Sequence, residues 1–342
     1  MRGHANGDAG ERGRVMVQIY VTRRIPDVIR RQLEVAGVVS AREDHHPIPR
    51  NTLLAGVEKA DALLCYDDDH IDRAVMASAR RLRVISTASV GIDHIDMSAA
   101  GERGIVVCHA PGAAEHAAAD MAMALLLACA RHLIEADLFV KSRRWEDWNP
   151  EQLLGEELRD HTIGIIGLGN IGLQVAHRAV GFGMRILYYD ARRHPEAEDI
   201  LRIQYGSLDN VLREADFVSL HVPLTADTTC LIGKRELRLM KPTAYLINTS
   251  RGSVVKQTAL VQALREGWIA GAGLDVYEEE PLPADDPLLN LPNVVLSPHI
   301  GAHTPRSILS TLSIAAEQIV DVLQGHQPAH PVAWHGEIKK AA

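Results

Sequence analysis

Short, nearly continuous runs of apolar residues recur along the chain, and amphipathic stretches separate them. Strands of a parallel sheet keep such apolar runs, because helices cover both faces of the sheet. The alternation therefore predicts an α/β protein with two doubly wound parallel-sheet domains of the Rossmann or flavodoxin type. The predicted strands are VMVQIYVT (15–22), ALLCY (62–66), LRVIST (82–87), IVVCH (105–109), TIGIIGLG (162–169), RILYYD (185–190), FVSLHVP (217–223), AYLINTS (244–250), GAGLDVY (271–277) and NVVLSPH (293–299).

The longest apolar run of the chain, MAMALLLACA at 121–130, is flanked by charged residues. It is too short to cross a bilayer, so we expect no membrane span there and place the run in a buried helix. Its Ala-, Leu- and Met-rich surroundings predict one long helix from about Glu115 to Val140.

Composition narrows the class of protein further. The 342 residues suffice for two domains, and 46% of them are hydrophobic. The net charge of −8 gives no indication of the basic surface that binds nucleic acid, so we expect no nucleic-acid partner. The four cysteines are scattered without a Cys-x-x-Cys pair, which is typical of a reduced, cytoplasmic protein. Residues 1–14 are polar and Gly-rich, and we expect a disordered tail there, not a signal peptide.

A glycine motif lies at the end of the strand predicted at 162–169. Gly167, Gly169 and Gly172 have G-x-G-x-x-G spacing between an apolar strand and an amphipathic helix. The first glycine makes a tight turn, the second lets the backbone approach a pyrophosphate, and the third lets helix and strand pack closely. A dinucleotide-binding loop is the favoured interpretation, with a glycine turn that binds nothing as the alternative.

The next predicted strand ends at Asp190. A carboxylate at this place can bind both ribose hydroxyls and repel a 2′-phosphate, which favours NAD(H). Arg192 and Arg193 follow at once and could accommodate a 2′-phosphate, so NADP(H) remains possible.

Charged or imidazole side chains follow three later strands. Arg251 comes after AYLINTS, Asp275 and a run of three glutamates end GLDVYEEEP, and His299 follows Ser297 and a proline. Ligands of open α/β sheets lie beyond the carboxyl ends of the strands, so we expect these residues to share one site. Each residue alone has a plainer explanation, as a surface ion pair or a loop residue.

Together, a guanidinium, a carboxylate and an imidazole beside a nicotinamide have a defined chemistry. Arginine binds a substrate carboxylate bidentately and polarises the neighbouring carbonyl group. Histidine delivers a proton to the carbonyl oxygen as hydride reaches the carbon. A carboxylate on the other ring nitrogen fixes the tautomer and raises the pKa of the histidine.

These motifs, in this order, resemble those of the D-isomer-specific 2-hydroxyacid dehydrogenase family over nearly the whole chain. The similar segments are LLGEELRDHTIGIIGLGNIG, HVPLT, MKPTAYLINTSRG, GLDVYEEEPL and SPHIGAHT. The N-terminal segments VTRRIP, LLCYDDDHID, VISTASVGIDHID and WEDWNP are similar to the glyoxylate/hydroxypyruvate reductase branch. Asp190 departs from the ending expected of members of that branch that use NADPH, so the cofactor need not follow the branch.

The resemblance assigns roles to individual residues. It implies that Arg251 binds the substrate carboxylate, that His299 is the acid/base, and that Glu280, the last of the three glutamates, is its partner. Glu278 and Glu279 are then expected to be solvated. Backbone N–H groups around Val90 and Gly91 would also bind the substrate carboxylate. The implied cofactor-binding residues are Gly167, Gly169, Asn170, Ile171, Gly172, Asp190, Val222, Pro223, Thr249, Asp275, His299 and Gly301.

The family pattern also implies a domain organisation. We expect a discontinuous substrate-binding domain of residues 15–110 plus 300–335 and an NAD(P)-binding domain of residues 111–299, with a cleft between them. The expected activity is NAD(P)H-dependent reduction of a small 2-oxo acid, glyoxylate or hydroxypyruvate, to glycolate or the D-2-hydroxy acid. A phosphoglycerate or other D-2-hydroxyacid dehydrogenase is the alternative within the class. An NAD-sensing binding protein, like the corepressor relatives of the family, is the alternative from another class.

Two further features have competing interpretations. YDDDH at 66–70 could suggest metal ligands, but consecutive residues rarely converge on one ion, so no metal site is expected. Trp145 and Trp148 are expected either to pack into a local core or, as the family resemblance implies, to lie near the partner of a homodimer.

Overall fold

The structure is a computed structural model and describes residues 16–333. Within this range the chain divides into two compact units. The first unit comprises the residues up to Pro111 and those from Ser310 onward, and the second comprises Gly112–Leu309. The tail expected at 1–14, and the end of the segment expected at 300–335, lie outside the described residues.

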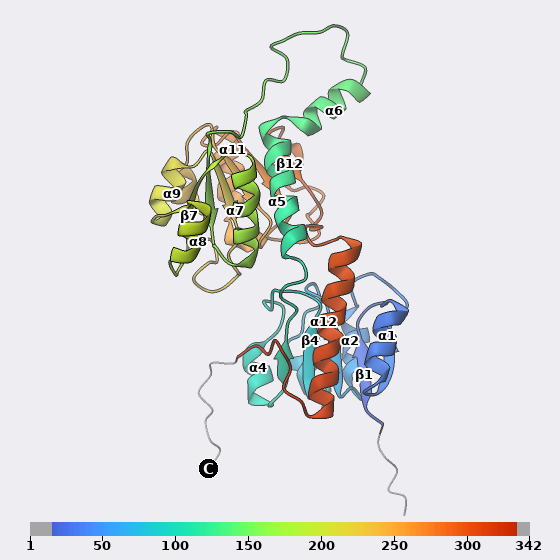
Figure 1. The fold of residues 1–342 in the computed structure, drawn as a ribbon. Helices are drawn as coiled ribbons and strands as arrows, with labels where there is room; N and C mark the ends of the chain where they lie inside the picture. The colour runs from blue at the N-terminus through green and yellow to red at the C-terminus, as the bar shows by residue number, and fades with distance from the viewer. Residues whose placement is uncertain (1–15, 334–342) are drawn as a thin grey trace, which may run out of the picture. The chain divides into compact units, whose positions relative to one another are not determined.

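The first unit is built on a parallel five-stranded sheet in the order β2-β1-β3-β4-β5. Leu63 and Cys65 of β3 face one hydrophobic core, and Ala62 and Leu64 face another, so both faces of the sheet are buried. Helix α12, from the far end of the chain, lies along this sheet (Figure 1) and packs into the second core. The elements are β1 (Gln18–Val21), α1 (Asp27–Glu34), β2 (Val38–Ala41), α2 (Arg50–Val57), β3 (Ala62–Cys65), α3 (Arg73–Ser78), β4 (Val84–Thr87), α4 (Met97–Glu102), β5 (Val106–Cys108) and most of α12 (Pro305–Gln324), which belongs to this unit from Ser310 onward.

The second unit contains a parallel seven-stranded sheet in the order β12-β11-β10-β9-β6-β7-β8. This is the Rossmann order, with one strand added next to β11. Helices α5 and α7 pack on one face, and α9, α10 and α11 pack on the other. The elements are α5 (Glu115–Ala130), α6 (Leu133–Lys141), β6 (Thr162–Ile166), α7 (Asn170–Gly181), β7 (Arg185–Tyr189), α8 (Pro195–Leu201), β8 (Gln204–Tyr205), α9 (Leu208–Glu214), β9 (Phe217–Leu220), α10 (Lys234–Leu239), β10 (Tyr245–Asn248), η1 (Gly252–Val254), α11 (Gln257–Arg265), β11 (Gly271–Leu274), η2 (Pro287–Asn290) and β12 (Val294–Leu296).

The predicted fold class, two doubly wound parallel-sheet α/β units, is confirmed. Each strand predicted from an apolar run is present, although most are shorter than the run. Two strands were missed, β2 and β8, and both lie at sheet edges. Their residues are exposed or only half-buried, so they lack the apolar run that marks a central strand.

The single helix predicted from Glu115 to Val140 is wrong. Helix α5 ends at Ala130 and α6 begins at Leu133, with an angle of 63° between them. His132 lies between them in the left-handed region, with φ 50°, which interrupts the helical hydrogen bonding. Among the described residues, no single helix is long and apolar enough to cross a membrane, and α5 and α6 pass that test only as a bent pair.

The local-core interpretation of the two tryptophans is also wrong. The side chains of Trp145 and Trp148 are 59% and 79% exposed. The neighbouring helix α6 buries none of its residues. The segment that follows α5 therefore presents apolar side chains to its surroundings.

Candidate functional site

The residues predicted to form the site of the second unit gather at the carboxyl edge of its sheet. The last residues of adjacent strands pair in register across this edge, namely Tyr189, Ile166, Leu220, Asn248, Leu274 and Leu296. Every predicted site residue of this unit lies in or beyond one of these strand ends. The parallel register therefore brings together residues that are far apart in the chain.

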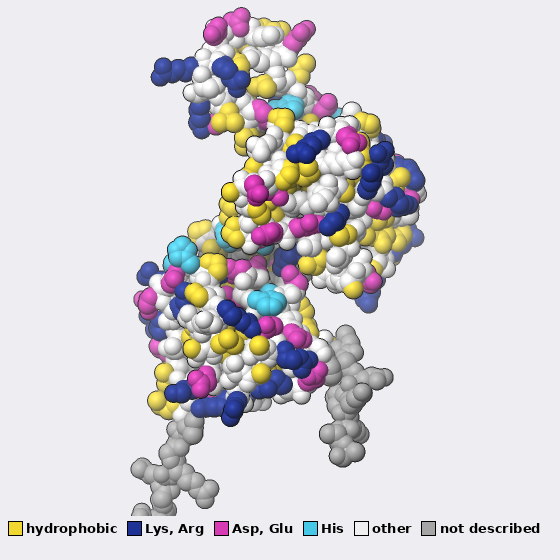
Figure 2. Space-filling model, turned by 180° about the vertical axis from the view of Figure 1, so that it is seen from behind, with side chains coloured by type: hydrophobic (Ala, Val, Ile, Leu, Met, Phe, Trp, Pro, Cys, Tyr) yellow, Lys and Arg dark blue, Asp and Glu magenta, His cyan; other side chains and the backbone are white. Residues whose placement is uncertain are grey.

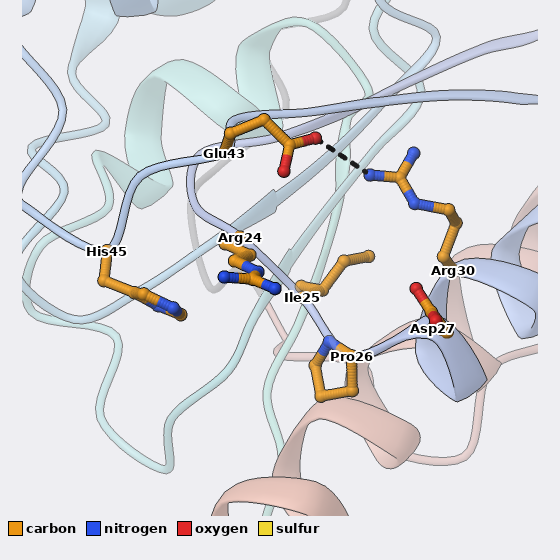
Figure 3. A pocket seen from close by; sticks show the side chains of 7 residues that line it. All are labelled: Arg24, Ile25, Pro26, Asp27, Arg30, Glu43 and His45. Carbon is orange, nitrogen blue, oxygen red and sulfur yellow. Dashed lines mark ion pairs between the residues drawn. The ribbon is translucent and has the colours of Figure 1, made fainter.

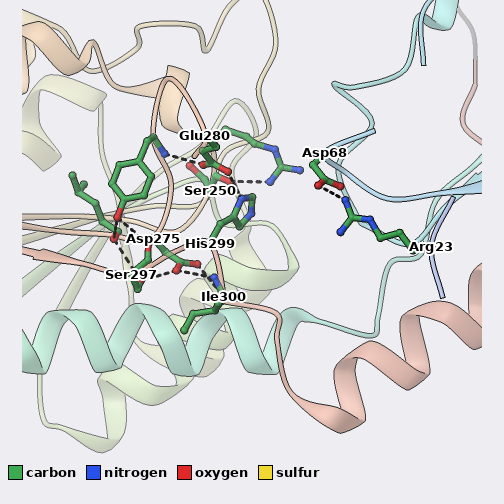
Figure 4. A network of polar contacts seen from close by, with 12 residues as sticks. Arg23, Asp68, Ser250, Asp275, Glu280, Ser297, His299 and Ile300 are labelled. Carbon is green, nitrogen blue, oxygen red and sulfur yellow. Dashed lines mark hydrogen bonds and ion pairs between the residues drawn. The ribbon is translucent and has the colours of Figure 1, made fainter. Parts of the chain in front are cut away.

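His299 and Glu280 form the hydrogen-bonded pair predicted from the sequence. The Nδ1 atom of His299 lies 2.6 Å from Oε2 of Glu280 (Figure 4), and both side chains are 34% exposed. Since a carboxylate only accepts, Nδ1 of His299 carries the proton in this hydrogen bond. The Tyr277 N–H donates to the other Glu280 oxygen at 2.9 Å. The carboxylate is thus fixed at both oxygens.

The electrostatics of Glu280 favour its charged form. Partial burial raises its pKa, but the His299 hydrogen bond and charge, the Tyr277 N–H and the Arg251 charge outweigh burial and hold the pKa below its ordinary value. By contrast, burial lowers the pKa of His221 to about 3, so this imidazole stays neutral near pH 7. Of these two histidines, only His299 has a carboxylate partner fit to stabilise a protonated ring.

Asp275 holds the turn that carries His299. Its carboxylate is 1% exposed and accepts from Ser297 Oγ at 2.6 Å, Ile300 N at 2.9 Å and Gly301 N at 2.7 Å (Figure 4). Within this turn His299 has a φ of 53°, a conformation that non-glycine residues rarely adopt. The hydrogen bonds to the buried Asp275 carboxylate hold His299 in this strained conformation. Strained residues of this kind are common at functional sites.

Arg251 lies directly beyond β10, in a turn held by Asn248. The Asn248 side chain donates to Arg251 O at 3.0 Å and accepts from Ser250 N at 3.0 Å. The next residue, Gly252, packs against the backbone of Tyr277, so that a Cβ there would lie 1.8 Å from the Tyr277 carbonyl. This contact brings the loop with Arg251 against the loop with Glu280.

The glycine loop has the geometry that its motif predicts. Gly167 has a φ of 94°, and a Cβ there would lie 2.7 Å from His221 O. A Cβ on Gly172 would lie 2.1 Å from Gly167 O, whereas Gly169 faces open space. Helix α7 begins at Asn170, followed by Ile171. No side chain of the described residues caps it, so its first N–H groups are open to an anion.

Further predicted cofactor-binding residues surround this loop. Asp190 accepts from Leu168 N at 2.7 Å, which ties the end of β7 to the glycine loop. Val222 and Pro223 follow β9. Thr249 follows β10, and its hydroxyl is buried with no hydrogen-bond partner within residues 16–333. A backbone cradle, an uncapped helix and an orphaned hydroxyl fit a bound dinucleotide.

Val90 and Gly91 belong to the first unit, in the loop beyond β4. Gly91 O accepts from Ser89 Oγ at 2.7 Å, and Val90 O lies 2.9 Å from Nδ1 of His109. Within the described part of the chain, neither the Val90 nor the Gly91 N–H donates a hydrogen bond. The loop is thus held through its carbonyl groups, and these two donors are open.

The consecutive glutamates at 278–280 have different roles. Glu278, expected to be solvated, accepts from Gln257 N at 3.0 Å at the start of α11 and lies 3.4 Å from Lys256 Nζ. It therefore helps to fix the N-terminus of this helix. Sequence reasoning also missed Tyr277, whose N–H holds Glu280 and whose hydroxyl donates to Ser297 O at 2.8 Å. Its place between Asp275 and Glu280 was the available signal.

The first unit also contains a separate pocket of about 580 Å³ (Figure 3). None of the predicted site residues lines it. Arg30 and Glu43 face each other across it, 3.8 Å apart. Its lining residues are Arg24, Ile25, Pro26, Asp27, Arg30, Glu43 and His45.

Charges of both signs are interspersed over the described residues on the face shown in Figure 2. Within residues 16–333, no group of three or more His, Cys, Asp or Glu side chains is placed to hold a metal ion.

A doubly wound sheet with a glycine loop at its carboxyl edge is the architecture of a dinucleotide-binding domain. Residues 123–301 match the model of the D-isomer specific 2-hydroxyacid dehydrogenase NAD binding domain. The chain belongs to this family and is an NAD(P)-dependent 2-hydroxyacid oxidoreductase.

Similar proteins match nearly the whole chain. It is 44% identical to a glyoxylate reductase of Thermococcus litoralis, over 92% of this chain and 96% of that protein. The TT0316 protein of Thermus thermophilus superposes with a TM-score of 0.87 at 42% identity, covering 93% and 100% of the two chains. A glyoxylate/hydroxypyruvate reductase of Sinorhizobium meliloti, solved with NADP and malonate, has a TM-score of 0.81 at 29% identity and covers 93% and 97%.

Proposed function

We propose that this enzyme reduces glyoxylate or hydroxypyruvate to glycolate or the corresponding D-2-hydroxy acid, with a reduced nicotinamide as hydride source. The observation that carries the proposal is the 2.6 Å pair of His299 and Glu280 at the carboxyl edge of the cofactor-binding sheet. The similarity to glyoxylate reductases over more than nine-tenths of the chain supports the substrate.

In this proposal His299 donates the proton and Glu280 stabilises the protonated form of His299. The bound nicotinamide would supply a hydride to the carbonyl carbon. His299, with Nδ1 engaged by Glu280, gives the proton on Nε2 to the carbonyl oxygen, which becomes the hydroxyl group. The charged Glu280 stabilises the protonated imidazole before transfer, and solvent restores the proton afterwards.

The substrate carboxylate is bound by cationic and backbone donors. Arg251 donates to it and polarises the adjacent carbonyl group. In the first unit, the N–H groups of Val90 and Gly91 are the proposed additional donors. They are suited to this role because Val90 is exposed and neither N–H has a hydrogen-bond acceptor among residues 16–333.

The cofactor is proposed to be NAD(H) in preference to NADP(H). Asp190 lies at the end of β7 with 19% of its side chain exposed, where it can accept from ribose hydroxyls and repel a 2′-phosphate. NADP(H) remains the alternative, because the Sinorhizobium meliloti relative was solved with NADP.

We also propose that the protein is a homodimer. Helix α6 and the following segment expose Leu133, Ile134, Leu138, Val140, Trp145, Trp148, Leu153 and Leu154, a set we name the apolar arm. A concentration of exposed apolar side chains in one segment is typical of an interface that another chain covers.

Turnover by the purified protein tests the proposed function. Glyoxylate, hydroxypyruvate, pyruvate and phosphohydroxypyruvate are each supplied with NADH and with NADPH, and oxidation of the cofactor is followed. Faster turnover of the first two substrates is expected. Preference for phosphohydroxypyruvate or pyruvate would replace the assigned substrate, and cofactor binding without any turnover would favour an NAD-sensing protein.

A further inference from the structure

Arg193 lies just beyond Asp190, yet its guanidinium is engaged elsewhere. Its Nε atom donates to Glu198 Oε1 at 2.8 Å and its Nη2 donates to Glu198 Oε2 at 2.7 Å. This is the bidentate geometry that an arginine would otherwise offer to a phosphate. Glu198 lies in the first turns of α8, so the ion pair folds the Arg193 side chain onto that helix.

Glu198 is itself fixed to the core of the second unit. The Tyr188 hydroxyl donates to Glu198 Oε1 at 2.7 Å and accepts from His194 N at 2.7 Å. Tyr188 is fully buried, and only 14% of the Glu198 side chain is exposed, against 63% for Arg193. The carboxylate is therefore a rigid acceptor, and the exposed arginine is the partner that can move.

We propose that Glu198 is a specificity-determining residue that withdraws Arg193 from the ribose 2′ position and so favours NAD(H) over NADP(H). The inference rests on the proposed function in that it takes the ribose site to lie at Asp190. A 2′-phosphate would have to compete with Glu198 for the same guanidinium donors. Glu198 thus acts through Arg193, as a positioning residue, and needs no contact with the cofactor.

The neighbouring residues Arg192 and Asp190 do not act on cofactor choice through the Arg193 guanidinium. Arg192 binds Asp190 through its backbone N–H at 3.0 Å, and its side chain makes no hydrogen bond or ion pair with any of residues 16–333. Asp190 acts by charge repulsion on the phosphate itself. The Glu198–Arg193 pair adds a second effect, because it removes the attraction between the Arg193 guanidinium and a 2′-phosphate.

Binding titrations test the proposal without any 2-oxo acid present. The dissociation constants for NADH and NADPH are measured by nicotinamide fluorescence, and those for ADP and 2′,5′-ADP by calorimetry. Glu198→Gln keeps an acceptor for Tyr188 but removes the charge that holds Arg193. We expect at least a tenfold gain for NADPH relative to NADH, about 1.4 kcal/mol, and the same gain for 2′,5′-ADP relative to ADP.

Three controls assign the gain to Arg193. The double variant E198Q/R193Q should return to within twofold of the native ratio, and Glu198→Asp, which keeps the charge, should retain most of the native preference. Arg193→Gln alone should leave the native ratio unchanged, because Arg193 is already withdrawn.

The proposal is overturned if Glu198→Gln leaves the ratio unchanged, if the gain persists in the double variant, or if Arg193→Gln alone weakens NADPH binding tenfold. Because no substrate is used, failure to reduce glyoxylate would not affect this result. Failure of the native protein to bind either dinucleotide would overturn both proposals.

Discussion

At the residue scale, the Glu280–His299 hydrogen bond gives a pH-dependent prediction. Despite partial burial, the pKa of Glu280 is held below its ordinary value, mainly by the hydrogen bond from His299, so its carboxylate is charged near neutral pH. In the proposed mechanism this charge stabilises protonated His299, the form that donates the proton in reduction, and so extends activity to higher pH. In Glu280→Gln we expect the alkaline limb of the reduction profile to move down by about one pH unit.

Profiles of kcat/KM against pH in both directions measure this shift. In the oxidation direction His299 acts as the base, so the acid limb should move to lower pH in the same variant. An unchanged limb in both directions would mean that another residue, or none, partners His299. Glu279→Gln is a matched control, since that exposed neighbour makes no hydrogen bond or ion pair with other described residues.

Arg251 gives a prediction about substrate recognition. Arg251→Ala should lower kcat/KM for glyoxylate by far more than tenfold, because in the proposed mechanism the substrate carboxylate loses its bidentate partner. Arg251→Lys should recover only part of the loss, since an ammonium cannot reproduce the planar fork. The dissociation constant for NADH should stay unchanged in both. A loss below tenfold in the alanine variant, about 1.4 kcal/mol of barrier, would remove Arg251 from the mechanism.

At the element scale, Gly252 decides how closely the loops after β10 and β11 approach. A Cβ there would meet backbone atoms of Tyr277 at 1.8 Å, and backbone cannot rotate away as a side chain can. Gly252→Ala should therefore separate the loops that carry Arg251 and Glu280. Overpacking of this kind costs about 1–3 kcal/mol or more, so both the Tm and kcat/KM should fall.

Calorimetry and steady-state kinetics measure the two effects together. Gly181→Ala is the matched control, because Gly181 ends α7 and an added Cβ would meet nothing within 4 Å. The control should keep the native Tm and activity. If Gly252→Ala behaved like the control, the close packing of the two loops would not be what positions Arg251.

The elements that could be predicted from sequence are those whose burial produces a continuous apolar run in the chain. The central strands are apolar throughout because both faces are covered, whereas β2 and β8 lie at edges and lack that signal. The break at His132 arises from one left-handed residue, for which neither glycine nor proline gave warning. The pairing of Glu280 with His299 was predictable because the family motifs name both residues. The capture of Arg193 by Glu198 depends on side-chain conformations and on Tyr188, so the sequence alone left Arg193 open as a phosphate ligand.

At the scale of the whole molecule, the apolar arm predicts the oligomeric state. Each exposed apolar side chain is ordinary by itself, but this segment concentrates them on one helix and the residues after it. Burial against the arm of a second copy would remove this surface from water. Light scattering after gel filtration should therefore give about twice the chain mass of 37.4 kDa.

Substitutions in the arm separate this interface from general surface effects. Leu138→Glu combined with Trp148→Ser should give the mass of a single chain, because a charge and a lost aromatic group disfavour the apolar contact. Ile200→Ser in α8 is the matched control: that side chain is 75% exposed but lies outside the arm, so the native mass should persist. A native protein that already runs at 37.4 kDa, or an arm variant that stays at twice that mass, would contradict the prediction. In either case the exposed tryptophans would need a partner other than a second copy of this chain.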